Sequence, residues 1–595
     1  MNGKPTLADI GSVRSNYLIG RAMKHYLVAS ILSTIVVQLN VIVDGIVVGQ
    51  FVSPDALSAV NLYSPISLAI VSIGSLLGTG ATVLAARYIG ERNAEKTDRT
   101  LSTALFSLLV AGAAIAAAIL LFRNRLTDLL CNEERISGYL TGYMMIMGCF
   151  GLFQMLSSFF GLAVEAEGQP RLVTFAQTIS ASANIVLDLL FVGAFGWGIE
   201  GAAWASVISS AVSTGFLLRH LVSAKCTLKF RPFRLFSFKS LSGNLKQGLP
   251  LIAGNLILML LIFFLNRIIL LKQGADGMFV MSVCINILTF GMLFSNGVGA
   301  MTLSIGGFLF GQKDFDGLRI LVGKSLKFLL CIAILVLVVG EIFPSLLASL
   351  FGAKAEMLEY ASFGIRVFVL IVPCFLFALF FANEYQMLGH LALPPVMIAL
   401  FPVVLFPSMF IWSSAAGPEN IWYAFPQAGV VVVIVALAGS LIVRRLSKDD
   451  LRPVTLLPRR SAQCLFNASI GADEPDISGL LDNMLVSASS RISDEKILFK
   501  IRLTAEELLI NIFQHSHKAG EHYFVDVILT EDSGKLSLAI KDDGKAFNPM
   551  ISDAEENQYG LKIVRYACAD MDYKYMFGQN MTYLTWITNP ETIEK

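Results

Sequence analysis

The stretch WYAFPQAGVVVVIVALAGSLIVRR, residues 422–445, decides the architecture of this chain. Its apolar run is close to the roughly 20 residues that a helix needs to cross the hydrocarbon core of a bilayer. The run ends at Arg444-Arg445, where the character of the sequence changes. Apolar runs of similar length fill most of the chain before this pair, and mixed polar segments follow it. We therefore expect a membrane-embedded body followed by a globular domain.

Composition supports a membrane protein. The chain has 595 residues, of which 55% are hydrophobic and 15% are charged, whereas soluble proteins carry about 25% charged residues. The net charge is only +1, and the basic residues are spread over separate segments rather than gathered in one patch, so no nucleic-acid partner is expected. The eight cysteines include no Cys-x-x-Cys pair, so their spacing indicates neither a zinc site nor a disulfide framework.

The apolar segments predict twelve transmembrane helices in two lobes of six. Their runs are continuous rather than alternating, which excludes a closed β-barrel. The predicted spans lie near 27–50, 57–85, 100–122, 139–163, 172–194, 201–222, 249–271, 278–303, 322–343, 362–388, 392–412 and 422–443. Residues 1–224 would form the first lobe and residues 225–445 the second.

Basic residues predict the orientation. With an inside N-terminus, basic side chains gather in the inner segments and are sparse in the outer loops. The positive-inside rule then places both termini in the cytoplasm of a multi-pass protein of the inner, or plasma, membrane. The inner residues include Lys4, Arg14, Arg21, Lys24, Arg87, Arg92, Lys96, Arg99, Arg219, Lys225, Lys229, Arg231, Arg234, Lys239 and Lys246.

An internal repeat relates the two lobes. Gly78-Thr-Gly80-Ala81-x-x-Leu84 recurs as Gly297-Val-Gly299-Ala300-x-x-Leu303. Each copy precedes a polar turn, Gly90-Glu-Arg-Asn93 in the first and Gly311-Gln-Lys-Asp314 in the second. Six spans separate equivalent positions, so the lobes share one orientation. Such parallel repeats suit two lobes that rock about a central cavity.

Ionisable side chains inside predicted spans indicate a transport pathway, because they are costly there. Asn184 and Asp188 are four residues apart and share a helix face, and Asp44 on another span could complete a pocket with them. Carboxylate and amide oxygens could bind Na⁺, or a carboxylate could take a proton. Glu384 in the tenth span is a further candidate.

Residues 15–445 resemble the multidrug and toxic compound extrusion (MATE) family. The resemblance is carried by several motifs in the first lobe and one at the start of the second. They are Val43-Asp44-Gly45 with Gly49, Gly78-x-Gly80 with Arg87-x-x-Gly90, Glu167-Gly168-Gln169-Pro170, Asn184-x-x-x-Asp188, Gly201-Ala-Ala-Trp-Ala-Ser206 and Gly248-Leu-Pro250.

This resemblance implies that Asp44, Asn184 and Asp188 bind the coupling Na⁺ or H⁺ as the exported compound leaves. Ser206 stands where the family often has threonine and could supply another oxygen. Residues 249–271 contain no acid, unlike some branches of the family. Asn383 occupies the position of the family's acid in span ten, and Glu384 follows it, so these two are the second-lobe candidates.

The part after Arg445 begins with a basic, proline-containing linker at 446–462, expected to follow the anionic inner leaflet. A compact α+β domain at 463–595 follows, with helices near 476–491, 494–515 and 560–570 and strands near 522–530 and 535–542. Three of its motifs resemble the GHKL (Bergerat-type) ATPase fold, specifically anti-sigma-factor serine kinases. They are Glu506-Glu507-Leu-Leu-Ile-Asn511, Asp542-Asp543-Gly544 and Tyr559-Gly560-Leu561.

The resemblance implies an ATP site with Mg²⁺. Asn511 would hold the Mg²⁺, and Glu507 would act as general base if the domain is catalytic. Asp542 would accept the adenine amino group, and Gly544 would let the base approach. Gly560 would present backbone N–H groups to phosphate at a helix start.

Three functions remain in view. The first is a cation-coupled antiporter exporting small amphipathic or cationic compounds, with an ATP-binding regulatory domain. ATP is not expected to drive transport, because the chain has no Gly-x-x-x-x-Gly-Lys-Ser/Thr loop. The second is a membrane sensor with a serine-kinase-like output that acts on a cytoplasmic protein substrate or antagonist. The third is a flippase for a lipid-linked substrate, which would need a more basic cavity than Arg366 alone supplies.

Overall fold

The computed structural model describes most of the chain and divides it into two compact units. One unit comprises Met1–His25, Asp314–Leu321 and Pro458–Lys595, and the other comprises Tyr26–Lys313 and Val322–Leu457. The described residues are 15–52, 54–130, 134–223, 226, 228, 235–350, 355–415, 417–447, 450–458, 464–471, 476–516, 523–532, 534–550 and 559–588.

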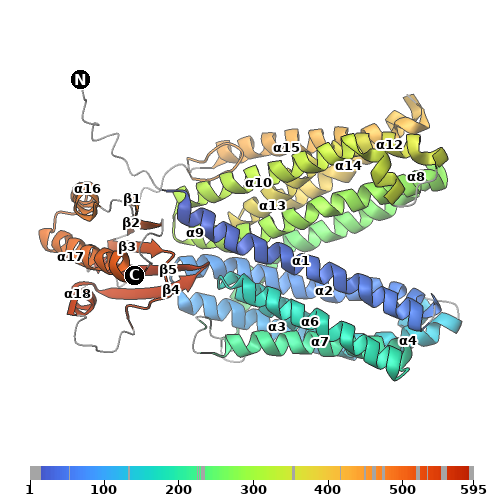
Figure 1. Ribbon diagram of the computed structural model, residues 1–595, viewed down its shortest axis with the longest axis horizontal. Helices are drawn as coiled ribbons and strands as arrows, with labels where there is room; N and C mark the ends of the chain where they lie inside the picture. The colour runs from blue at the N-terminus through green and yellow to red at the C-terminus, as the bar shows by residue number, and fades with distance from the viewer. Residues whose placement is uncertain are drawn as a thin grey trace. The chain divides into compact units, whose positions relative to one another are not determined.

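The larger unit is entirely helical in its described elements, and its helices fall into two groups (Figure 1). The first group is α1 (Tyr17–Phe51), α2 (Pro54–Gly90), α3 (Ala94–Leu130), α4 (Glu134–Phe150), α5 (Leu152–Ala166), α6 (Pro170–Asp188), the π-helical turn η1 (Leu189–Ala194) and α7 (Gly198–Leu221). The second group is α8 (Phe238–Met301), the π-helical turn η2 (Thr302–Gly306), α9 (Gly307–Gly311), α10 (Phe315–Ile342), α11 (Pro344–Leu350), the 3₁₀ turn η3 (Ala355–Met357), α12 (Leu358–Val369), α13 (Val372–Met387), α14 (Leu393–Ala415), the 3₁₀ turn η4 (Pro418–Tyr423) and α15 (Ala424–Leu446).

Each group packs around a core of its own. In the first group, Tyr63 of α2 and Tyr143 of α4 are buried and meet edge to face with ring centroids 5.3 Å apart. In the second, Trp422 is fully buried and stacks on Phe425 with centroids 5.9 Å apart. Aromatic pairs of this kind stabilise a core by about 0.5–1.5 kcal/mol beyond the burial of their area. Two separate cores are consistent with two lobes.

The predicted class of polytopic α-helical membrane protein is confirmed. Among the described residues, nine helices are long and apolar enough to cross a membrane, or ten if Ser137–Phe150 and Leu152–Ala166 form one bent span. The predicted span 249–271 falls within α8, and the span 278–303 lies in α8 up to Met301 and ends in η2. Gly274 separates them with a φ of 68° and a ψ of −154°. Such a conformation favours glycine, because a Cβ would clash with the backbone.

The repeated polar turns have the same conformation in both halves. Arg92 and Lys313 occupy equivalent positions, and both have a positive φ, 56° and 59°. After each, an Asx side chain caps the next helix: Asn93 Oδ1 accepts from Lys96 N at 3.0 Å, and Asp314 Oδ1 accepts from Gly317 N at 2.9 Å. Such caps accept hydrogen bonds from backbone N–H groups in the first turn, which have no partner within the helix itself.

The repeat also brings the two helix groups together at one point. Gly90, at the end of α2, and Gly311, at the end of α9, approach so closely that neither position has room for a side chain. A Cβ on Gly90 would collide with the carbonyl oxygen of Phe308, and a Cβ on Gly311 would collide with that of Arg87. Small residues at such crossings allow close helix packing inside membranes.

The smaller unit contains a five-stranded antiparallel sheet in the order β1-β2-β3-β5-β4. Figure 1 shows its three helices on one side of the strands, where apolar side chains of both layers form one core. This agrees with the predicted α+β domain. The elements are β1 (Cys464–Gly471), α16 (Ile477–Ser489), α17 (Glu495–Asn511), the π-helical turn η5 (Ile512–Ser516), β2 (Phe524–Asp532), β3 (Lys535–Asp542), α18 (Tyr559–Ala567), β4 (Asp570–Met576) and β5 (Gln579–Ile587).

The segment predicted as a linker packs in part against the second helix group. Leu451 and Leu456 are buried together with Tyr385 of α13 and Met397 of α14. The Tyr385 hydroxyl donates a hydrogen bond to the carbonyl oxygen of Val454 at 2.6 Å. The sequence analysis read 446–462 as a basic linker and did not single out its apolar side chains. Burying these side chains against the helices is favourable, because it removes their apolar surface from water.

Candidate functional site

Three predicted polar residues of the first helix group lie in its interior. Asp188 is the last residue of α6 and Asn184 is one turn before it, with exposed fractions of 0% and 1%. Asp44, on α1, is half-buried. Among the described residues, both Asp188 carboxylate oxygens, Asp44 Oδ1 and Asn184 Oδ1 are buried and have no hydrogen-bond partner. Buried polar atoms without partners are rare in folded proteins, so these four oxygens set this region apart from the rest of the helix interior.

The structure brings the two acids together. Asp44 and Asp188 are close enough to interact electrostatically, and Tyr143 of α4 lies near both. Two neighbouring carboxylates cannot both be ionised at low cost, so a proton or a cation between them is favoured. The chemistry of the pair thus suits the predicted role of binding a cation or a proton.

Ser206 of α7 also belongs to this region, because Asn184 Nδ2 donates to its Oγ at 3.5 Å, a long hydrogen bond. A cavity of about 240 Å³ opens beside these residues. Its lining is largely polar and comes from α1, α2, α4, α5, α6 and α7: Asp44, Ser67, Tyr143, Met147, Phe150, Gly151, Gln154, Ser180, Ser206, Val207, Ser209 and Ser210.

Sequence reasoning missed most of this lining. Ser206, Ser209 and Ser210 are three and four residues apart on α7, so helical periodicity could have revealed this polar face. Ser67 and Gln154 also have polar residues at helical spacing, Ser64 and Ser157, but serines are so frequent in these helices that periodicity alone does not single out Ser67 and Gln154. Only the folding of α2 and α5 around the cavity identifies them.

The second-half candidates lie on α13 and are not among the residues that line this cavity. Asn383 Nδ2 donates to the carbonyl oxygen of Leu379 at 2.9 Å, a bond within its own helix. Glu384 is fully buried, and within the described part of the chain neither of its carboxylate oxygens has a hydrogen-bond partner. Glu384 thus lies on a helix of the second group and not among the residues that line the cavity beside Asp44.

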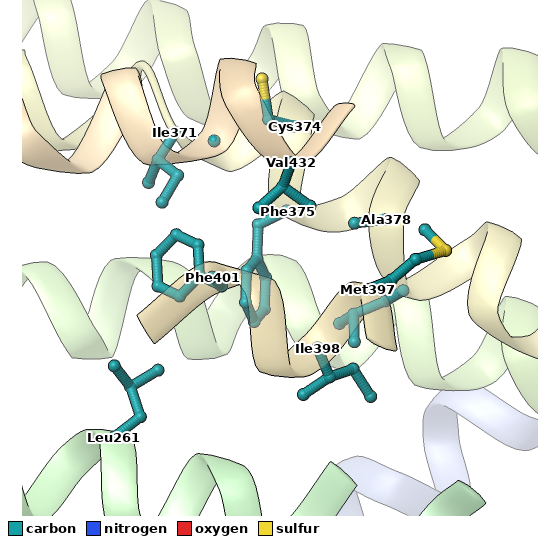
Figure 2. A pocket seen from close by; sticks show the side chains of 11 residues that line it. Leu261, Ile371, Cys374, Phe375, Ala378, Met397, Ile398, Phe401 and Val432 are labelled. Carbon is teal, nitrogen blue, oxygen red and sulfur yellow. The ribbon is translucent and has the colours of Figure 1, made fainter. Parts of the chain in front are cut away.

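A second cavity lies within the second helix group and is apolar. Figure 2 shows Phe375, Phe401 and Ile398 among the side chains around it, together with Leu261 and Met397. Its volume is about 30 Å³, room for no more than a few water molecules. It is too small to hold a drug-sized molecule in this conformation.

The predicted Mg²⁺ and base residues share one face of α17. Asn511 Nδ2 donates to the Glu507 carbonyl oxygen at 2.9 Å and to Glu507 Oε1 at 3.1 Å. Both side chains are half-buried. Both hydrogen bonds use the side-chain amide nitrogen of Asn511. Its side-chain carbonyl oxygen is not used by either bond, and oxygen is the ligand type that Mg²⁺ prefers. These two residues fit the predicted roles.

The predicted adenine-binding residue is held firmly. Asp542, at the end of β3, is 3% exposed, and its Oδ1 accepts from Gly544 N at 2.8 Å and from Asn580 Nδ2 at 3.0 Å. The Tyr573 hydroxyl donates to Asn580 Oδ1 at 2.6 Å. Burial and the Asp542 charge raise the pKa of Tyr573 to about 12, so this hydroxyl keeps its proton. Asn580 and Tyr573 were not predicted from the sequence.

The phosphate end of the predicted site is described only in part. Gly560 is the second residue of α18, at the helix N-terminus as predicted. The preceding loop, 551–558, lies outside the described residues. Helix N-terminal N–H groups attract phosphate, so the position of Gly560 fits the predicted role.

The neighbours of Asp542 face the other side of the sheet, because side chains alternate along a strand. Lys541 pairs with Asp314 with an Nζ–Oδ2 distance of 3.2 Å, and Asp543 pairs with Arg21 of α1. These contacts lie within the smaller unit, which includes the first residues of α1 and α10. Further bonds hold the same segments: Asn467 Nδ2 to Asp316 Oδ2 at 3.2 Å, Ser15 N to Ser469 Oγ at 2.8 Å, and Gln579 Nε2 to the Leu18 carbonyl oxygen at 2.6 Å.

Comparisons with known proteins agree with both parts. Residues 29–190 and 250–410, more than half of the chain, match the MatE family model, and residues 477–586 match the histidine kinase-like ATPase domain. The chain is 22% identical over 428 residues to the multidrug export protein MepA of Staphylococcus haemolyticus, covering 70% of this chain and 92% of that protein. It is 23% identical over 441 residues to the probable multidrug resistance protein YoeA of Bacillus subtilis, covering 71% and 93%.

Solved structures show the same fold. A crystal structure of a MATE protein in the bent conformation superimposes with a TM-score of 0.66 at 22% identity, covering 73% of this chain and 99% of that one. The predicted MATE resemblance and the predicted ATPase-like domain are thus confirmed. The chain belongs to the MatE family of multidrug efflux transporters and carries a histidine kinase-like ATPase domain after its membrane helices.

Proposed function

We propose that this chain is a cation-coupled antiporter that exports small amphipathic or cationic compounds. The observation that carries the proposal is the pair Asp44–Asp188, whose buried oxygens lack partners and which adjoins a polar cavity. The multidrug export and resistance functions named for MepA and YoeA support the substrate class. The basic inner segments support an orientation with both termini in the cytoplasm.

The coupling ion is either H⁺ or Na⁺. A proton on one carboxylate would remove the repulsion between Asp44 and Asp188. A Na⁺ ion would need oxygen ligands, and Asn184 Oδ1 and Ser206 Oγ are available beside the acids. In either case the arriving charge changes the balance between inward-facing and outward-facing lobes, and the exported compound leaves as that balance shifts.

Transport by the purified full chain in vesicles tests this proposal. Efflux of a fluorescent cationic dye is measured with an imposed H⁺ gradient, an imposed Na⁺ gradient, or neither. We expect one gradient to drive efflux in the wild type and Asp188→Asn to abolish that response. Asp128→Asn, an exposed acid of α3, is the matched control. Gradient-driven efflux by Asp188→Asn at the wild-type rate would overturn the site assignment.

For the second domain, we propose that it binds ATP with Mg²⁺ and regulates transport. Asp542 would bind the adenine of ATP, and Asn511 would bind the Mg²⁺ that bridges its phosphates. If the domain is catalytic, ATP would also be the source of the phosphoryl group that is transferred. The carrying observation is that Lys541 and Asp543 flank Asp542 and pair with Asp314 and Arg21 at the starts of α10 and α1. A shift of β3 on nucleotide binding would therefore move two residues that hold these helix starts.

The regulatory link is tested by loading vesicles with ATP, ADP or no nucleotide on the side of the tail. We expect ATP to change the efflux rate of the full chain but not of Asp542→Asn or of a truncation after Leu457, where the larger unit ends. Equal rates for all three proteins, with and without ATP, would disprove regulation while leaving antiport intact. Phosphorylation of a cytoplasmic protein by the full chain, with efflux indifferent to ATP, would favour the sensor with a kinase-like output. Transfer of a lipid-linked substrate between leaflets, without dye efflux, would favour a flippase.

A further inference from the structure

A cluster of three metal-ligating side chains lies outside the coupling site and the nucleotide site. Glu167 follows the last residue of α5, His220 lies in the last turn of α7, and Cys226 lies in the stretch between α7 and α8. One ligand atom from each residue lies within 4.8 Å of the other two. His220 and Cys226 are six residues apart, whereas Glu167 lies 53 residues before His220 and only one of the three is a cysteine, so cysteine spacing gave no sign of a zinc site.

The geometry is close to that of a tetrahedral metal site. His220 Nε2 is 2.9 Å from Glu167 Oε2, and Cys226 Sγ is 3.5 Å from the same oxygen. Ligand atoms in a tetrahedral zinc site lie about 3.3–3.7 Å apart, given metal–ligand bonds of about 2.0–2.3 Å. The imidazole and the carboxylate would need to separate by only about half an ångström to admit a metal ion between the three groups.

The environment also favours a cation. Glu167 is 4% exposed, so its carboxylate is largely removed from water. The half-buried Asp98 of α3 lies near enough to Cys226 to interact electrostatically and could offer a fourth oxygen. A thiolate, an imidazole and carboxylates form a donor set of borderline softness, which selects Zn²⁺ over Mg²⁺ or Ca²⁺.

We propose that Glu167, His220 and Cys226 form a binding site for a Zn²⁺ ion. The ion fastens the stretch after α7, which leads into the second helix group, to the ends of α5 and α7. Without zinc, the same groups form the hydrogen-bonded cluster that the structure shows. Zinc therefore changes how firmly this connection is held and takes no part in binding the exported compound.

The proposal is tested by measuring metal binding to the full chain, purified with an affinity tag that contains no histidine. The protein is incubated with equimolar Zn²⁺ and desalted, and bound zinc is measured by mass spectrometry. We expect one zinc ion per chain, and a dissociation constant raised at least tenfold in Cys226→Ser and in His220→Gln. Cys149→Ser, a half-buried thiol on α4, is the matched control and should retain wild-type binding.

Co²⁺ provides a second readout, and its first result is obtained on the wild type alone. Co²⁺ added to the wild type should produce a thiolate-to-cobalt charge-transfer band, and this band should be absent from Cys226→Ser. The proposal is overturned if the wild type shows no such band. It is equally overturned if the wild type retains no zinc after desalting, or if both variants bind zinc as tightly as the wild type. The cluster would then be an ordinary hydrogen-bonded ion pair.

Discussion

Lys541 on β3 and Asp314, just before α10, form an ion pair in which the side chains are only 3% and 2% exposed. The other carboxylate oxygen of Asp314 caps α10 through Gly317 N at 2.9 Å. One aspartate therefore both begins a helix of the transporter and neutralises a lysine next to Asp542, the predicted adenine-binding residue. In the first half of the chain, Asn93 makes the equivalent cap without a carboxylate.

Asp314→Asn should destabilise the protein by about 3–5 kcal/mol, because it removes the carboxylate that pairs with the buried Lys541 charge. Asparagine is itself a good N-cap, so this change isolates the loss of the ion pair. The measurement is the unfolding midpoint of the purified full chain. Adding Lys541→Met to Asp314→Asn should recover part of the loss, because it removes the buried positive charge that Asp314 neutralised.

The control for this prediction is the exposed ion pair between Arg502 and Asp482, 2.7 Å long with side chains 39% and 58% exposed. Asp482→Asn should change stability by less than about 1 kcal/mol, because solvent screens such pairs. Equal effects of Asp314→Asn and Asp482→Asn would show that the buried pair contributes no more than a surface one.

Gly311→Ala should destabilise the larger unit by about 1–3 kcal/mol, because the added Cβ would overlap the Arg87 carbonyl oxygen. Gly323→Ala on α10 is the control, since nothing lies within 4 Å of the position of its Cβ. It should stabilise the protein by about 0.5–1 kcal/mol through helix propensity. The measurement is the unfolding midpoint of each variant. An unchanged midpoint in Gly311→Ala would mean that the helices can separate at little cost and would contradict the prediction.

Glu384→Gln should retain gradient-driven efflux, because Glu384 lies on α13 and does not line the cavity that contains Asp44. Glutamine keeps the side-chain volume and removes an acid that has no hydrogen-bond partner among the described residues. The vesicle assay with imposed gradients measures this. Loss of the gradient response, with protein amount unchanged, would place part of the coupling in the second half.

Asp542→Asn should weaken ATP binding at least tenfold, because the adenine amino group would lose its carboxylate acceptor. The asparagine carbonyl can still accept from Gly544 N and Asn580 Nδ2, so the local fold should persist. Calorimetric titration of the full chain with ATP and Mg²⁺ measures the change. Asp570→Asn, an exposed acid at the start of β4, should bind ATP as the wild type does; equal affinities for all three proteins would exclude Asp542 from the site.

Much of the candidate coupling site was predictable from the sequence. Asp44, Asn184 and Asp188 are polar residues in apolar runs, and the cost of burying them marks each one without knowledge of its neighbours. The rest of the cavity lining was harder to predict, because Ser67 and Gln154 reach the cavity only through the way α2 and α5 pack around it. In the tail, the motifs led to Asp542, whereas Asn580 and Tyr573 required the pairing of β3 with β5 and of β4 with β5.

By itself, the sequence determined the membrane class, the repeat, the end of the membrane-spanning part near Arg444-Arg445 and the ATPase-like domain. Each of these follows from local composition or from motifs within a short stretch of chain. Tertiary structure decided which distant residues meet: Asp44 with Asp188, Lys541 with Asp314, and Glu167 with His220 and Cys226. These contacts depend on how helices and strands pack, and no single segment carries that information.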